Sequence, residues 1–318
     1  MAESGVQSRR GGRRIRVVWN PTAGSKAGLP TNLVDEAALR AALERHDTLI
    51  ELAAPTSEAE AREAVRRAIH DGVDVVAAAG GDGTVALVAD ELIGTEVALG
   101  ILPLGSAMNV ARSLEIPRDL DDAVGILVDG ERRAIDVGYV GERPFHEAVS
   151  VGLSAALFGE AQRIDRGHYR AIVGLIGVFA RHRPAAVRLR LDGRELVTRA
   201  LMVTIANAPY TGLGLTLAPD ARLDDGFLDV RIVGRFSTGE LVRHFWSIAF
   251  GRRAYHPRIR TERARTVRVE SRRSMPVRAD DADLGTTPVE VTLRSRCLWV
   301  IAPAAGAQRP ETEDRPQT

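Results

Sequence analysis

The chain has 318 residues, enough for two domains, and its 45% hydrophobic and 4% aromatic residues suit an α/β protein packed with small aliphatic side chains. The formal net charge of +1 excludes a global attraction to nucleic acid, and the arginines are dispersed without an aromatic stacking pattern. The single cysteine, Cys297, excludes an internal disulfide and a cysteine metal cluster, and it indicates a reducing compartment.

No segment has the pattern of a signal peptide or a membrane span. The apolar run behind the basic N-terminus is short, and the longest apolar stretch, residues 171–180, has about half of the roughly 20 residues that a membrane helix needs. We therefore expect a cytoplasmic protein, with peripheral contact at the inner membrane face as an open alternative. Residues 1–13 and 304–318 are polar, and we expect them to be disordered tails.

The first half of the chain alternates predicted strands and helices, as in a parallel sheet with helical crossovers. Ser57 and Glu60 have the spacing of a capping box, which marks the start of one of the helices. The predicted elements are a strand at 15–20, a helix at 33–46, a strand at 47–53, a helix after Ser57, a strand at 73–79, a helix from about 84, a strand at 96–104 and a helix at 106–114.

Three of the predicted strands end in glycine-rich polar turns. These turns are "NPTAG" at 20–24, "GGDGT" at 80–84 and "PLGSAMN" at 103–109. The carboxyl ends of parallel strands meet at one edge of a sheet, which is where open α/β sheets bind ligands. The sequence therefore predicts that all three turns line one rim.

From about residue 131 the pattern changes to strands with hairpin signals. Strand-like alternation on both sides of Asp192 and Gly193 indicates a type I′ hairpin, because these residue types tolerate the positive φ that the turn requires. We expect a mostly antiparallel β-sandwich over 135–303, after an α/β domain over 14–134. Its expected strands include runs at 226–234, 266–271, 288–293 and 297–303, with helical insertions at 154–182 and 238–252.

The turn "GGDGT" has the chemistry of a phosphate site. Its glycines let a ligand approach the backbone and expose successive N–H groups, while the helix that begins near Thr84 directs its positive end to the same place. The pattern is neither a Walker A loop nor GxGxxG, since no Gly-Lys-Ser/Thr follows it. We therefore expect this turn to bind a polyphosphate in a different way.

Asp82 lies in the middle of this turn, where a bare carboxylate would repel phosphate. It would belong there if it held Mg²⁺, took a proton from an acceptor hydroxyl or contacted another group of the ligand. The structural alternative is that Asp82 only caps the helix that follows. The turn chemistry alone leaves both interpretations open.

The ordered set of "NPTAG" at 20–24, "GGDGT" at 80–84 and "PLGSAMNVARSL" at 103–114 resembles the diacylglycerol kinase catalytic-domain family, in particular its bacterial soluble lipid kinases, which are related to sphingosine and ceramide kinases. The likeness continues through 207–233 and 277–303. It implies an N-terminal doubly wound, NAD-kinase-like α/β domain and a mostly antiparallel β-sandwich domain for the lipid. The implied reaction transfers the γ-phosphate of ATP to a hydroxyl of a lipid such as diacylglycerol or a sphingoid base.

Carried over position by position, the resemblance implies that Asp82 lies near the γ-phosphate and the acceptor hydroxyl, and that Asp280 is an auxiliary base or metal contact. Mg²⁺ would accompany ATP. Asp225 would hold a regulatory metal with main-chain oxygens of Arg222 and Phe227, although "LDDG" without the resemblance indicates an ordinary hairpin turn. The expected nucleotide-binding residues are Asn20, Pro21, Thr22, Gly24, Thr56, Gly80, Gly81, Asp82, Gly83, Thr84, Gly105, Ser106 and Asn109.

The chain also departs from the family pattern. The usual Asn-Glu pair after GGDGT is replaced by apolar residues at 85–87, and Val110 stands where an aspartate is common. Ala282 occupies the position of the glutamate credited with general-base duty; Asp281 and Asp283 could substitute only if the loop differs. Since a general base contributes about 10² to 10⁴ in rate, we still expect an active kinase.

The expected partners are a lipid substrate, a transient membrane surface and a second copy in a homodimer, with no nucleic acid. Segments 166–183 and 243–260 combine apolar and basic residues, so either could rest on an anionic membrane. The alternative is that both segments are helices that cover the sandwich core.

Two rival functions remain open at this stage. An NAD kinase-like enzyme shares GGDGT but would carry an Asn-Glu pair downstream, for which "VSVGLSAALFGE" is a poor match. A catalytically silent nucleotide- or lipid-binding protein would explain Leu87, Val110 and Ala282, and it would bind ATP without releasing a phosphorylated product.

Overall fold

The computed structural model describes residues 12–21, 23, 25–26, 29–30, 34–46, 50–156, 183–212, 214–234 and 259–304. Thr22, Gly24, nearly all of the expected tails and most of the two expected helical insertions lie outside these residues. So do most of the two segments that the sequence suggests for membrane contact. In the part of the chain that is described, no helix is both long and apolar enough to cross a bilayer.

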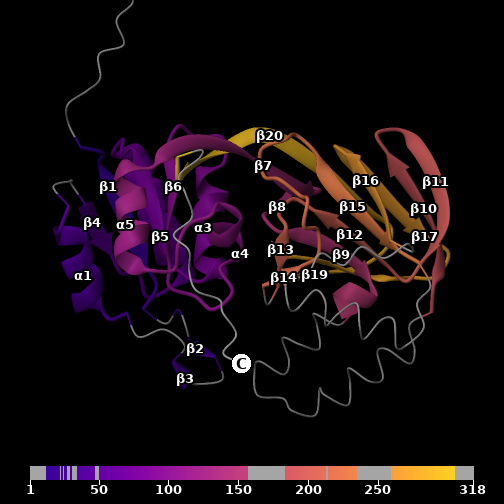
Figure 1. Ribbon diagram of the computed structural model, residues 1–318, viewed down its shortest axis with the longest axis horizontal. Coiled ribbons are helices and arrows are strands. Elements are labelled where there is room, and N and C mark those ends of the chain that lie inside the picture. The colour runs from indigo at the N-terminus through magenta and orange to yellow at the C-terminus, as the bar shows by residue number, and fades with distance from the viewer. Residues whose placement is uncertain are drawn as a thin grey trace, which may run out of the picture.

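The N-terminal domain is a parallel sheet with helices on both faces, on the left of Figure 1. The strand order is β6-β5-β1-β4. Helices α2 and α3 pack together on one side, and α1 and α5 pack together on the other. The elements are β1 (Ile15–Trp19), α1 (Glu36–Glu44), β4 (Ile50–Ala53), α2 (Glu58–His70), β5 (Val75–Gly80), α3 (Asp82–Leu92), β6 (Ala98–Pro103), α4 (Asn109–Ser113) and α5 (Leu120–Asp129), with a small hairpin of β2 (Ser25–Lys26) and β3 (Leu29–Pro30).

The second domain is a sandwich of antiparallel strands, on the right of Figure 1. One layer has the order β16-β15-β12-β9-β18-β19, and the other contains β11, β10, β17, β20, β7 and β8. Its strands are β7 (Glu131–Val140), β8 (Arg143–Phe145), β9 (Ala148–Gly152), β10 (Ala185–Leu191), β11 (Arg194–Ala200), β12 (Met202–Ala206), β15 (Leu228–Val233), β16 (Ile259–Ala264), β17 (Thr266–Ser271), β18 (Pro276–Ala279), β19 (Ala282–Thr286) and β20 (Val289–Ala302), and β13 (Tyr210–Thr211) pairs with β14 (Leu215–Thr216) beside them.

Apolar side chains from both layers of the sandwich form one core. Along β10 buried and exposed residues alternate strictly, which is the period that a strand with one buried face requires. Val187 of β10 and Val267 of β17 pack in the same cluster as Val149 of β9 and Ile205 of β12, which belong to the opposite layer. The expectation of an α/β domain followed by a mostly antiparallel β-sandwich is confirmed.

One strand joins the two domains. β20 pairs in parallel with β6 at Val300 and Leu99, and it pairs antiparallel with β7 and β17. Both runs expected as strands, 288–293 and 297–303, are extended, but the prediction of two separate strands is wrong. They form one strand, β20, whose register is irregular between Arg294 and Leu298. The irregularity is stabilised by Asp136 of β7, whose carboxylate accepts a hydrogen bond from the backbone of Arg296.

Two local predictions are confirmed in detail. Asp192 and Gly193 have φ values of 48° and 84°, as a type I′ hairpin between β10 and β11 requires. Ser57 accepts a hydrogen bond from Glu60 N and caps α2, while the Glu60 carboxylate reaches back to the start of the helix and accepts from Thr56 N at 2.8 Å.

Gly138 of β7 packs directly against the ring of Phe145 in the sandwich core. A Cβ there would lie 2.1 Å from the ring of Phe145, which is buried in the sandwich core. We expect Gly138→Ala to lower the free energy of unfolding by about 1 to 3 kcal/mol in chemical denaturation, because the ring must move. Gly125→Ala in α5 is the matched control, since its Cβ meets nothing within 4 Å. An unchanged stability of Gly138→Ala would contradict this packing.

Candidate active site

The turns after β1, β5 and β6 lie together at the carboxyl edge of the parallel sheet. Asn20 N donates to Ala79 O at 2.9 Å, and Asn20 Nδ2 lies 3.1 Å from Thr84 Oγ1. Leu104 N donates to Gly80 O at 3.0 Å. Side chains and backbone therefore join each outer turn to the central one, which gives the single rim that strand order alone suggests.

Two glycines of this rim leave room that a side chain would fill. A Cβ on Gly105 would lie 2.5 Å from the Cα of Gly81 and 2.8 Å from Met108 Sδ, so its absence allows the backbones of two turns to pack against each other. A Cβ on Gly80 would lie 2.5 Å from Thr84 Oγ1, so its absence leaves space for the Thr84 side chain of the same turn. The Cβ position of Gly83, in contrast, is open.

Helix α3 begins at this rim with Gly81 as its N-cap residue, and no side chain of the described residues caps its N-terminus. The first-turn amides of a helix have no partners within the helix, and they carry the positive end of its dipole. Such an end is suited to an anion such as a phosphate group.

The carboxylate of Asp82 connects the turn after β5 to the start of α4. It accepts hydrogen bonds from Met108 N at 2.8 Å and from Asn109 N at 2.6 Å. Asp82 is thus the first residue of α3 but caps α4, which differs from the alternative in which it caps its own helix. Burial raises the pKa of Asp82, while these two backbone donors and the charge of Arg118 act in the opposite direction.

Arg118 holds the same loop from its other side. Its guanidinium donates to the carbonyl oxygens of Ser106 and, at 3.1 Å, Ala107. A third contact reaches Gly105 O at 3.4 Å. The loop that follows β6 is therefore fixed at its amides by Asp82 and at its carbonyls by Arg118, a residue that the sequence pattern does not single out.

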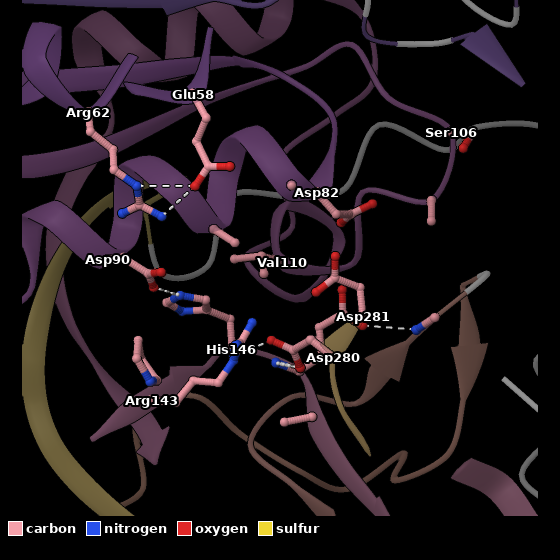
Figure 2. Close-up of a pocket in the computed structure, with 17 residues that line it drawn as sticks. Glu58, Arg62, Asp82, Asp90, Ser106, Val110, Arg143, His146, Asp280 and Asp281 are labelled. Carbon is pink, nitrogen blue, oxygen red and sulfur yellow. Dashed lines mark hydrogen bonds and ion pairs between the residues drawn. The ribbon is translucent and has the colours of Figure 1, made fainter. Parts of the chain in front are cut away.

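A cavity of about 600 Å³ separates this rim from the sandwich domain. Figure 2 shows Asp82 and Ser106 on one side of it and Asp280 and Asp281 on the other, with His146 beside Asp280. Both residues that the sequence suggests as catalytic, Asp82 and Asp280, thus line one cavity although they are far apart along the chain.

Asp280 lies in the turn between β18 and β19, with a φ of 47°. One carboxylate oxygen accepts from His146 N at 2.8 Å, and the other accepts from Glu147 N and Ala148 N, each at 3.0 Å. Burial raises the pKa of Asp280, whereas the charge of His146 and the three backbone donors lower it. These contacts make Asp280 an anchor for the segment that leads into β9.

The cavity is also lined by Glu147, which no motif of the sequence singles out. The residue is 7% exposed, and its carboxylate accepts from Asn109 Nδ2 at 2.9 Å and from Gly212 N at 2.8 Å. Burial raises the pKa of Glu147 well above its ordinary value, and the charges of Asp280 and Asp82 raise it further. The only sequence signal is a charged residue directly before the fully buried strand β9.

Asn109 links the two domains. Its side-chain amide donates to Glu147 and, at 2.8 Å, to Gly212 O, and the residue is fully buried. The side chain was expected in the nucleotide wall, but these contacts direct it to the sandwich domain. A second link joins Asp90 of α3 to His146, with 2.9 Å between Oδ1 and Nε2.

Two other residues expected to bind the nucleotide, Thr56 and Pro21, are exposed to solvent. The Thr56 hydroxyl lies 2.8 Å from the Glu60 carboxylate at the start of α2. Pro21 lies at the rim in the turn after β1. No assignment of these two residues to a ligand follows from their contacts, and their role stays a prediction.

At the expected regulatory metal site the Asp225 carboxylate has protein partners in this structure, and its metal-binding role with Arg222 and Phe227 stays a prediction. The Asp225 carboxylate pairs with the guanidinium of Arg263 and accepts from Phe227 N at 3.0 Å. The side chain of Arg222 pairs with Asp224 at 3.2 Å. A guanidinium thus neutralises the carboxylate that would bind the metal. Among the described residues, no group of three or more acidic, His or Cys side chains is arranged to hold a metal ion.

The rim, the open helix end and the acidic cavity define a nucleotide-dependent phosphotransferase. Comparison with known proteins gives the family. The diacylglycerol kinase catalytic domain matches residues 14–140, and the YegS C-terminal NAD kinase beta sandwich-like domain matches residues 147–302.

Individual relatives agree with these matches. A diacylglycerol kinase of Mycobacterium tuberculosis (strain CDC 1551 / Oshkosh) is 31% identical over 256 residues, which cover 78% of this chain and 82% of that protein. A diacylglycerol kinase of Staphylococcus aureus (strain bovine RF122 / ET3-1) is 25% identical over 92% of this chain and 93% of its own. A crystal structure of a diacylglycerol kinase from Bacillus anthracis has the same fold, with a TM-score of 0.71, 19% identity, and coverage of 92% of this chain and 98% of that one.

The chain therefore belongs to the diacylglycerol kinase family. It is a lipid kinase, as the ordered glycine turns suggest, and ATP is the type of nucleotide that such a kinase uses.

Two glycine substitutions separate packing from ligand contact at the rim. We expect Gly83→Ala to leave stability unchanged or raise it by up to about 1 kcal/mol, since alanine favours helices and the site is open. Its methyl group should still weaken Mg·ATP binding tenfold or more, measured by calorimetry, because it narrows the approach to the first turn of α3. Gly105→Ala should instead lower the free energy of unfolding by about 1 to 3 kcal/mol. Parental ATP affinity in Gly83→Ala would contradict phosphate binding at this turn.

Proposed function

We propose that the protein transfers the γ-phosphate of ATP to a hydroxyl of a lipid such as diacylglycerol or a sphingoid base. The observation that carries the proposal is the pairing of a phosphate-binding rim with acidic side chains across one cavity. Asp82 belongs to the rim and Asp280 to the sandwich domain, and both line this cavity. A triphosphate and an alcohol can meet only where both kinds of group are within reach.

The rim residues would bind and orient the triphosphate. The amides at Gly81, Asp82 and Gly83 are at the open end of α3, and the loop at 105–107 lies beside them. Phosphoryl transfer depends mainly on such positioning and on neutralisation of charge. Mg²⁺ would arrive with ATP and supply part of that neutralisation.

Asp82 would act at the boundary between the two substrates. Its carboxylate is held by the amides of Met108 and Asn109, so its position is fixed before either substrate binds. A fixed negative charge near the γ-phosphate disfavours any pose in which the phosphate turns toward it and favours the approach of a hydroxyl donor. The lipid would enter from the membrane surface, with its hydroxyl directed into the cavity.

The proposal is tested with purified protein, labelled Mg·ATP and mixed micelles that contain diacylglycerol or sphingosine, with NAD as a separate acceptor. We expect a phosphorylated lipid and no NADP. Asp82→Asn should lower kcat at least 10²-fold because the charge that orients the hydroxyl is lost, while the amide oxygen still accepts one backbone hydrogen bond.

Asp129→Asn, at the exposed end of α5, is the matched control and should keep parental activity. Phosphorylated NAD in place of lipid would identify an NAD kinase-like enzyme. ATP binding with no phosphorylated product in any arm would identify a binding protein of the same fold. Parental lipid phosphorylation by Asp82→Asn would remove Asp82 from the mechanism.

A further inference from the structure

We propose that Glu147 accepts the proton of the lipid hydroxyl, so that an acid from the segment before β9 does the work of the glutamate missing at Ala282. The inference rests on the proposed lipid kinase function and assigns a residue to its proton-transfer step. It starts from two observations. Glu147 is the most deeply buried acid that lines the cavity, and it does not belong to the turns that form the rim.

The position of Glu147 fits this role. The residue lines the same cavity as Asp82 and Asp280, and it is close enough to both for their charges to act on it. Its two carboxylate oxygens are fixed by Asn109 Nδ2 and Gly212 N. Because one of these donors comes from the start of α4 and the other from the loop after β13, the carboxylate is held between the two domains.

The three carboxylates differ in their hydrogen-bond donors. Asp280 accepts from three backbone amides and Asp82 from two, whereas Glu147 accepts from one backbone amide and one neutral side-chain amide. Each donor stabilises the ionised form and weakens the base. Asp280 has the most donors, and Glu147 has no more than Asp82. Glu147 has the smallest exposed fraction of the three, 7%, so burial raises its pKa most strongly.

The charged groups around Glu147 come from each neighbouring element. Asp82 lies on α3, and Asp280 and Asp281 lie on the turn between β18 and β19. His146 precedes it in the chain and is paired with Asp90. Arg62 and Arg143 also line the cavity, but the charges that act most strongly on Glu147, those of Asp280 and Asp82, are negative. The cavity therefore favours a proton on Glu147 over a further negative charge.

The proposed step balances as follows. The O–H bond of the lipid breaks and its proton moves to the Glu147 carboxylate. The oxygen forms a bond to the γ-phosphorus, and the bond from that phosphorus to the bridging oxygen breaks, with the electron pair left on ADP. Glu147 is neutral after transfer, which is its favoured form in this buried position, and the proton passes to water when the products leave.

Glu147→Gln tests the inference directly. Glutamine must place its NH₂ group against a donor, either Asn109 Nδ2 or Gly212 N, and it cannot accept the proton. We expect kcat for lipid phosphorylation to fall by about 10² to 10⁴. The parental enzyme requires ionised Glu147, so its kcat/KM should rise with pH through the raised pKa of this group, and the variant should lose that acid limb. Affinity for Mg·ATP should stay within threefold of the parental value.

Glu147→Asp is the second variant, because it keeps a carboxylate at a shorter reach. It should retain the acid limb and recover part of the activity that Glu147→Gln loses, whereas a purely structural role would leave the acid limb in both variants. An active parental enzyme with an unaltered pH profile in Glu147→Gln would overturn this inference and leave the kinase function intact. A parental enzyme that phosphorylates no lipid would overturn both.

Discussion

The hydrogen bonds from Met108 N and Asn109 N to the Asp82 carboxylate are the interaction on which the candidate site depends. They fix the turn after β5 against the start of α4 and so define the rim. They also bring the side chain of Asn109 to Glu147 and Gly212 of the sandwich domain. A single carboxylate thus helps to place the amides of the rim, the loop after β6 and the domain contact. Because the two bonds stabilise the ionised form, Asp82 can keep its charge despite burial.

Charge is divided unequally across the cavity. The rim offers amides and an open helix end, which favour anions, with Asp82 as its one carboxylate, while the sandwich side of the cavity carries Glu147, Asp280 and Asp281. A triphosphate is attracted to the first side and repelled by the second, so it is held at a defined depth. A neutral alcohol meets no such penalty and can approach the carboxylates. This division gives a physical reason for a phosphate donor and a hydroxyl acceptor to bind on different sides of the cavity.

The sequence predicted the fold well because its signals are local. Buried strands, glycine turns and the Asp192-Gly193 hairpin each follow from a few neighbouring residues. The contacts of Glu147 could not be predicted, since its partners Asn109 and Gly212 lie 38 and 65 positions away. The same holds for Asp225, where the carboxylate pairs with Arg263, 38 positions away. The Asn109–Glu147 contact depends on how the two domains pack, and the Asp225–Arg263 contact depends on the pairing of β15 with β16. No local pattern records either.

The most direct test of this account is a backbone amide NMR titration of the protein with Mg²⁺ and a non-hydrolysable ATP analogue. If the triphosphate binds at the rim, the largest shift changes will fall on Gly81, Gly83 and Thr84 and on the loop at 105–109. Strands of the sandwich that are remote from the cavity, such as β10 and β11, will be nearly unaffected. Unchanged amides at the start of α3, with shifts confined to the sandwich domain, would contradict the account.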